Sequence, residues 1–206
     1  SAPLPHQPSW EKRSASKRTS TLSNRAKSMS ELPPQLKTGS GMPMTGATPI
    51  AIPTFSGPGP HGAELAGIVR SNLDRSGFFA AIDPARFPGP VDGAAMPAFE
   101  TWKAVAAQYL VAGQVVADPD GRLRVDFRLW DVNSQQQILG LQFVAPGENW
   151  RRVGHKISDA VYKRLTGEDG YFDTRIVFVS ESGPRTQRRR VLTLMDQDGA
   201  NFQTLT

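Results

Sequence analysis

The stretch Asn149-Trp-Arg-Arg-Val-Gly-His-Lys-Ile-Ser-Asp-Ala-Val-Tyr-Lys-Arg-Leu-Thr-Gly167 decides the fold, because it has the pattern of one amphipathic helix with a defined end. Its apolar side chains recur every three or four residues: Trp150, Val153, Ile157, Val161 and Leu165. Gly167 is expected to end the helix, since glycine readily adopts the left-handed conformation of a helix C-terminus. We therefore predict a helix that buries one stripe.

The residues after this helix predict the start of a second domain. A short aromatic linker at residues 171–174 is followed by two strand-like runs, 175–180 and 189–195, around a polar loop. Asp196-Gln-Asp-Gly199 turns the chain again, and residues 202–206 begin a further run. One such unit cannot bury its own faces, so the hairpin is typical of the first unit of a repeat.

Upstream of the helix, strands and helices are interspersed. We predict strands at residues 50–55, 78–82, 108–117, 123–132 and 137–144, and helices at 63–76 and 99–106. In the strand 123–132, apolar residues alternate with charged ones, which indicates a sheet with one buried face. The order of elements predicts a two-layer α/β sandwich, in which helices cover a mixed sheet.

Charge is unevenly distributed along the chain. Residues 1–48 hold seven Lys and Arg residues against two glutamates, a net charge of +5, which equals the formal net charge of all 206 residues. This segment is rich in Ser, Pro, Lys and Thr and poor in aliphatic residues, so we predict a disordered basic tail. Because the charges are scattered, a tail without a specific partner is favoured over a basic arm that grips an acidic partner.

Several classes of protein are excluded or left open by composition. The chain has no cysteine, which excludes disulfides and thiol catalysis and fits either redox compartment. No run approaches the roughly 20 apolar residues of a membrane span. Residues 1–27 lack the apolar core of a signal peptide, and the chain has no initiating Met, so we expect a processed, cloned or truncated start.

The histidines do not indicate a reaction centre. His6, His61 and His155 have no second ligand or carboxylate at a useful spacing, so neither a metal site nor a catalytic triad is supported. His155 lies one residue from the edge of the apolar stripe, which favours a solvated or boundary histidine over a catalytic one. We therefore expect no catalytic residue and no metal ligand.

Three further motifs are better explained by structure than by ligand binding. Gly57-Pro-Gly59 departs from the phosphate-loop patterns, and its prolines remove backbone donors, so a strand-to-helix turn is predicted. Residues 118–121 and 196–199 lack the ligand set of an EF-hand and are predicted as hairpin turns. Arg188-Arg-Arg190 is more typical of a solvated hairpin loop than of a phosphate contact. No cofactor is implied, and no partner-binding residue can be assigned.

With these residues laid out, the helix at 149–167 resembles the last helix of the amino-terminal domain of the TolB family, the periplasmic proteins of the Tol–Pal system of Gram-negative bacteria. The resemblance continues through residues 170–180 and 194–201, which look like the opening of the six-bladed β-propeller of that family. Residues 50–53 and 73–82 also fit, so the resemblance covers about residues 49–206.

The resemblance implies a non-enzymatic adaptor in the periplasm. In the family, the propeller binds the lipoprotein Pal and the amino-terminal region binds the inner-membrane protein TolA. The assembly supports outer-membrane integrity and cell division and is exploited by imported bacteriocins. For this chain the resemblance implies TolA and Pal as partners, with no nucleic acid, no membrane insertion and a monomeric state.

Two departures from the family limit these expectations. The chain has one incomplete blade, so we expect the Pal-binding surface to be largely absent from it. Residues 1–48 do not match the segment that carries the TolA contact in the family, so no TolA-binding residue is carried over. A mistranslated or fused gene region is one hypothesis for this tail.

The predicted organisation is a disordered basic tail at residues 1–48, an α/β domain at 49–168, and a linker with an incomplete propeller blade at 169–206. Exposed strand edges on the hairpin predict disorder or self-association of that segment. Two other functions stay open. One is a different envelope-associated α/β accessory domain, such as a lipoprotein or secretion module without a propeller. The other is a nucleic-acid-binding protein that uses the basic tail.

Overall fold

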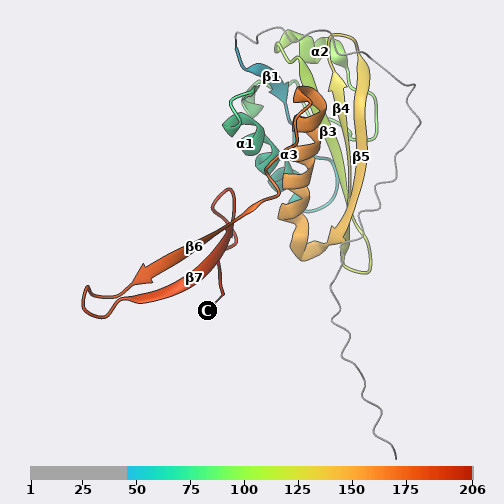
Figure 1. Ribbon diagram of the computed structural model, residues 1–206. Helices are drawn as coiled ribbons and strands as arrows, with labels where there is room; N and C mark the ends of the chain where they lie inside the picture. Colours follow the sequence, from blue (N-terminus) through green and yellow to red (C-terminus); the bar gives the residue numbers. More distant parts are fainter. Residues whose placement is uncertain (1–45, 206) are drawn as a thin grey trace, which may run out of the picture.

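The computed structural model describes residues 46–205, so the prediction for the tail falls almost entirely outside the described residues. Two sheets are present (Figure 1). The first has the strand order β2-β1-β3-β4-β5 and the second the order β6-β7-β8. The strands are β1 Thr48–Ala51, β2 Phe79–Ala81, β3 Tyr109–Ala117, β4 Arg122–Asp131, β5 Gln136–Pro146, β6 Arg175–Ser182, β7 Arg189–Asp196 and β8 Gln203–Thr204. The helices are α1 His61–Arg75, α2 Phe99–Ala104 and α3 Trp150–Thr166, with 3-10 turns at Pro84–Arg86 and Gly147–Asn149.

The first sheet is mixed, as the sequence predicted. β1 runs parallel to both β2 and β3, whereas β3, β4 and β5 are antiparallel neighbours. β1 ends at Ala51, four residues earlier than predicted. Pro53 has no N–H with which to pair to a neighbouring strand. The N–H of Phe55 is donated to the carbonyl of Gly62 at the start of α1 rather than to a strand.

The main core lies between this sheet and the pair α1 and α3, which lie side by side on one face (Figure 1). Val125, Phe127 and Leu129 of β4 are at most 1% exposed, so the predicted alternation is confirmed. A smaller cluster on the opposite face includes Trp102 of α2 and Trp130 of β4. The predicted mixed sheet with covering helices is thus confirmed, with a short third helix on the second face.

The helix predicted at residues 149–167 forms as α3. A 3-10 turn precedes α3, and Gly167 ends it with φ +84°, donating its N–H to the carbonyl of Lys163 over 2.9 Å. Val153, Ile157 and Val161 are buried against the sheet and α1. None of the helices within residues 46–205 is both long and apolar enough to cross a membrane.

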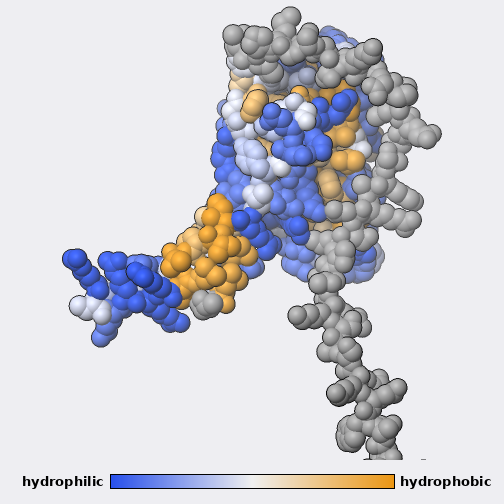
Figure 2. Space-filling view, viewed as in Figure 1, coloured by the Kyte–Doolittle hydropathy of each residue, from blue (hydrophilic) through white to orange (hydrophobic). Residues whose placement is uncertain are grey.

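The second sheet projects away from the first domain as a long hairpin (Figure 1). Apolar side chains cover the half nearer the domain, and hydrophilic ones cover the far tip (Figure 2). The exposed apolar side chains of this sheet are Ile176, Val177, Val179, Leu192, Phe202 and Leu205. The described segment forms a sheet rather than the disordered chain that was one predicted alternative, and self-association stays a prediction.

Candidate functional site: a buried histidine at the junction of the two sheets

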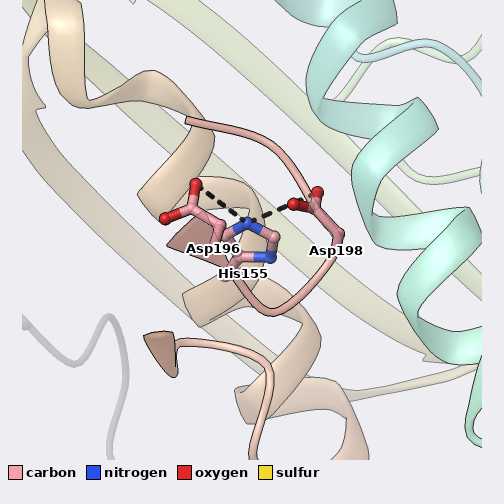
Figure 3. Close-up of side chains that lie close together, drawn as sticks. All are labelled: His155, Asp196 and Asp198. Atoms are coloured by element: carbon pink, nitrogen blue, oxygen red, sulfur yellow. Dashed lines mark ion pairs between the residues drawn. The ribbon is translucent and has the colours of Figure 1, made fainter. Parts of the chain in front are cut away.

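The two sheets meet at His155 on α3 and the turn between β7 and β8, where Asp196 and Asp198 point toward the imidazole (Figure 3). His155 is only 2% exposed. Its Nε2 atom lies 3.9 Å from Oδ2 of Asp196 and 3.7 Å from Oδ2 of Asp198. Both distances exceed that of a hydrogen bond, and among the described residues this nitrogen has no hydrogen-bond partner.

The turn places its two carboxylates through its own backbone. Gly199 has φ +82°, a conformation that favours glycine, and donates its N–H to the carbonyl of Asp196 over 2.9 Å. Asp196 in turn donates its N–H to the carbonyl of Ala200. The amide of Asn201 donates to Oδ2 of Asp196 over 2.6 Å, which holds that carboxylate toward α3.

Arginines neutralise the two carboxylates. The Nη2 atom of Arg151, one turn before His155 on α3, lies 2.5 Å from Oδ2 of Asp198. The Nε atom of Arg151 is 3.7 Å from Oδ2 of Asp196, and that of Arg175 is 3.7 Å from its Oδ1. Two negative charges are therefore matched by two positive charges, of which Arg151 is largely buried and Arg175 about half exposed.

The opposite side of the imidazole is held by α1. The amide nitrogen of Asn72, which is fully buried, lies 3.0 Å from Nδ1 of His155 and 3.0 Å from Oγ of Ser158. The carbonyl oxygen of Asn72 accepts from the amide of Gln197 in the β7–β8 turn. Since the amide nitrogen donates, Nδ1 is an acceptor, and we infer that the neutral ring carries its proton on Nε2, facing the carboxylates.

Burial lowers the pKa of His155 below its usual 6.5, although Asp198 and Asp196 oppose the shift. Removing a charged imidazolium from water is costly, and here this cost exceeds the attraction of two carboxylates that already face arginine. The histidine is therefore neutral near pH 7.

His155, Asp196 and Asp198 offer ligand atoms of the types that a divalent metal prefers, all within 4.8 Å of one another. The arrangement does not fit a metal well, because the Oδ2 atoms of both aspartates already face the guanidinium of Arg151. A cation would have to displace that side chain. Beside the cluster is a cavity of about 30 Å³, the size of a single water site. The geometry is that of a network of ion pairs and hydrogen bonds that joins α3 to the second sheet.

The linker between the sheets is also fixed to α3. Asp159 accepts the N–H of Phe172 over 2.7 Å and that of Asp173 over 3.1 Å. Phe172 is 1% exposed and packs on Tyr162 with 5.8 Å between ring centres. Nε of Arg152 lies 3.0 Å from Oδ1 of Asp173. Burial raises the pKa of Asp159 despite its backbone hydrogen bonds.

The structure corrects one prediction about the histidines. His155 is buried rather than solvated or at a boundary, because the side of α3 that carries it packs against α1 and the β7–β8 turn. The carboxylates that face it come from about 40 residues downstream, a distance that spacing within the helix could not reveal. His61 pairs with Glu64 at 2.9 Å near the surface, and His6 lies outside the described residues.

The remaining motifs behave as turns. Residues 57–59 connect β1 to α1, and residues 118–121 connect β3 to β4. The turn at 196–199 was also predicted, but its contribution to the junction was not. At the hairpin tip, Nη1 of Arg188 lies 2.8 Å from Oε2 of Glu181.

Comparisons with known proteins place these features in a family. Residues 42–138 match the family model described as the TolB amino-terminal domain. A Tol-Pal system protein TolB from Paramagnetospirillum magneticum is 48% identical over 163 residues, which cover 77% of this chain and 36% of that protein.

A solved TolB structure gives the same result. A crystal structure of TolB from Acinetobacter baumannii superposes with a TM-score of 0.67 at 32% identity, covering 78% of this chain and 38% of that one. The LpoB C-terminal domain from Salmonella enterica gives a TM-score of 0.37 at 13% identity, covering 49% of this chain and 83% of that one. The chain spans little more than a third of the length of each of these two TolB proteins. It belongs to the TolB family, whose amino-terminal domain it contains.

Proposed function

We propose that this chain is the amino-terminal part of a non-enzymatic, periplasmic adaptor of the Tol–Pal envelope complex, with TolA and Pal as its partners. The observation that carries the proposal is the 48% identity to a Tol-Pal system protein over 163 residues. In this role it supports outer-membrane integrity and cell division and is exploited by imported bacteriocins. The proposed adaptor is a monomer that neither inserts into the membrane nor binds nucleic acid.

We propose the same division of the chain as the sequence indicated: a tail at 1–48, the α/β domain at 49–168, and a linker with the first part of a propeller blade at 169–206. The exposed apolar side chains of β6, such as Val177 and Val179, support this division, because neighbouring blades in a repeat array would cover them. The contacts around His155 hold the second sheet in one orientation relative to the α/β domain. The closed, charge-balanced geometry of these contacts supports an adaptor rather than an enzyme.

A chimaera tests the proposed function. Residues 49–204 of this chain replace the corresponding segment of the Paramagnetospirillum magneticum TolB, in a strain that lacks its own TolB gene. The measurement is leakage of a periplasmic enzyme into the medium, compared with the unmodified protein and an empty vector. We expect the chimaera to return leakage to the level of the unmodified protein.

The opposite result is a chimaera that is exported and stable but leaks like the empty vector. That outcome would favour the competing interpretation, an envelope-associated α/β module with another role. Pal co-purification with the chimaera, but not with a chimaera that lacks residues 175–204, would connect the second sheet to a formed propeller.

A further inference from the structure

β5 is the outermost strand of the first sheet, and none of residues 46–205 pairs with its outer edge (Figure 1). It is eleven residues long, and none of its side chains is charged. Proteins commonly protect such edges with charges, with short strands or with bulges. The one irregularity in its pairing lies near its start, opposite Leu129 and Trp130, so most of the strand is regular.

The backbone groups that face outward can be identified from the register. Gly113 of β3 accepts the N–H of Ser56, and Val115 donates to Ser56, so these residues of β3 face away from β4. The alternate residues of β3 therefore bond to β4, and the register carries this alternation across to β5. In β5, residues 139, 141, 143 and 145 face β4, while residues 140, 142 and 144 face outward.

A side chain of α3 already contacts the start of this edge, where Ile138 is the extra residue of the bulge between the pairs Leu129–Leu139 and Trp130–Gln137. The Nε atom of Arg164, on the exposed side of α3, donates to the carbonyl of Ile138 over 2.8 Å. Within residues 46–205, the outward N–H and C=O groups of Gly140, Gln142 and Val144 have no such partner. Three consecutive outward positions are therefore available for pairing.

A groove of about 640 Å³ adjoins this edge on the sheet face away from α1 and α3. Gly140 and Gln142 line it together with two basic side chains of β4, Arg124 and Arg128. Asp126 lies between them but already accepts a hydrogen bond from Gln142 over 2.6 Å. Arg128 also donates to the carbonyl of Gly93 over 3.1 Å, and Arg124 lies 3.7 Å from a carboxylate oxygen of Asp118. The groove therefore combines free backbone groups with a lining in which Arg124, Arg128 and Asp126 leave one net positive charge.

We propose that the outer edge of β5 and the adjoining groove bind an extended, carboxylate-bearing segment of a partner protein as a sixth strand. Main-chain pairing along residues 140–144 supplies the affinity. A carboxylate on the partner pairs with the guanidinium of Arg164, which lies at the start of this edge through its bond to the carbonyl of Ile138. Residues 1–48 of this chain carry a net charge of +5, so charge opposes their use as this strand.

Selection from a random dodecapeptide library displayed on phage, with the full chain as bait, tests the specificity. We expect the enriched sequences to combine β-branched residues with Asp or Glu. The enriched peptides are then synthesised with a fluorescent label, and their affinity is measured by fluorescence anisotropy for the unmodified chain and two variants.

The two variants form a matched pair. Gln142→Pro removes one outward N–H, and the inner ladder is unaffected because position 142 does not face β4. Gln142→Ala removes the same side chain but keeps the N–H. We expect Gln142→Pro to weaken peptide binding about tenfold and Gln142→Ala to change it less than about twofold. Circular dichroism and the thermal midpoint establish that both variants are folded.

Amide hydrogen exchange gives a direct structural measurement on the unmodified chain. The amides of residues 140, 142 and 144 should exchange rapidly in the free chain, unlike those of 141 and 143, and become protected when the peptide binds. Equal affinity for the proline variant, or no enrichment of acidic peptides, overturns the proposal. Protection of these amides in the free chain also overturns the proposal. Protection that does not depend on protein concentration indicates that the chain's own residues 1–45 cover the edge. Protection that rises with dimer formation indicates that a second copy covers it.

Discussion

Arg151 and Asp198 lie 47 residues apart in the sequence and form a direct ion pair across the junction, with 2.5 Å between Nη2 and Oδ2. The pair joins α3 of the first domain to the turn that follows β7. Both side chains are less than a quarter exposed. Together with the hydrogen bond from Gln197 to Asn72, this contact connects the second sheet to the helices of the first.

Replacing Asp198 by Asn should loosen the second sheet, because the guanidinium of Arg151 would keep its charge and lose its nearest carboxylate. We expect a loss of about 2 kcal/mol in the free energy of sheet docking. Limited proteolysis of residues 170–205, followed by mass spectrometry, measures it. The control is Asp169→Asn, which removes the solvent-exposed ion pair with Lys163 and should leave the cleavage rate unchanged. Equal cleavage of both variants would show that the junction does not depend on this pair.

The stability of the protein should fall as the pH decreases from about 7.5 to 5.5. The pKa of His155 is lowered by burial from 6.5, so the unfolded chain takes up a proton near pH 6.5 and the folded chain only at lower pH. Protons therefore favour the unfolded state in this range. Urea denaturation at several pH values measures the slope.

His155→Gln is the control for this pH dependence. Glutamine does not titrate, so the variant should be less stable at pH 7.5 but should show a flatter dependence between pH 7.5 and 5.5. Staying above pH 5.5 limits the contribution of Asp159, whose pKa is raised. A slope unchanged by the substitution would assign the effect to another group.

Two glycines test the packing of α1 on α3. A Cβ at Gly154 would lie 3.0 Å from Cγ2 of Ile68 and 3.4 Å from Cδ2 of Leu65, whereas one at Gly67 would have no neighbour within 4 Å. Gly67→Ala should stabilise the protein by about 0.5–1 kcal/mol through helix propensity. Gly154→Ala gains the same propensity but should lower stability by about 1–2 kcal/mol through overpacking. Thermal denaturation measures both, and equal stabilisation would mean that the helices can separate at little cost.

Neighbouring aromatic residues of the linker test whether the linker belongs to the core. Phe172→Ala should lower the free energy of unfolding by about 3 kcal/mol, because it empties a buried site. Tyr171 is 48% exposed, and its replacement by Ala should cost much less. Chemical denaturation of the two variants measures the difference. Similar small losses would place the linker outside the cooperative unit.

Local patterns predicted most of the first domain. The stripe of α3 and the alternation of β4 are set by side chains three or four residues apart, or two apart, along one element, and these periods can be read directly. The end of α3 was also predictable, because residue 167 is a glycine, which adopts positive φ without steric strain. The hairpin and its turns followed from the same local rules.

The site at the junction could not be predicted in this way. His155 is buried by Asn72 from α1 and by the turn at Asp196, and their spatial proximity is a property of the tertiary structure. A partial signal existed: Gly154 and Ser158 flank the histidine on one face and allow close approach to α1. The free edge of β5 was equally hidden, since its near-continuous apolar run does not reveal which neighbour it lacks.

Asp196 lies at the base of the hairpin, opposite Arg175, and the loop that joins β6 to β7 lies at its far end. β6 and β7 each have eight residues, which corresponds to a reach of roughly 26 Å at about 3.3 Å per residue. A rotation of about 10° at the base would therefore move the far tip by roughly 4–5 Å. A change around His155 that rotated the hairpin would therefore be largest at a surface that those side chains do not touch.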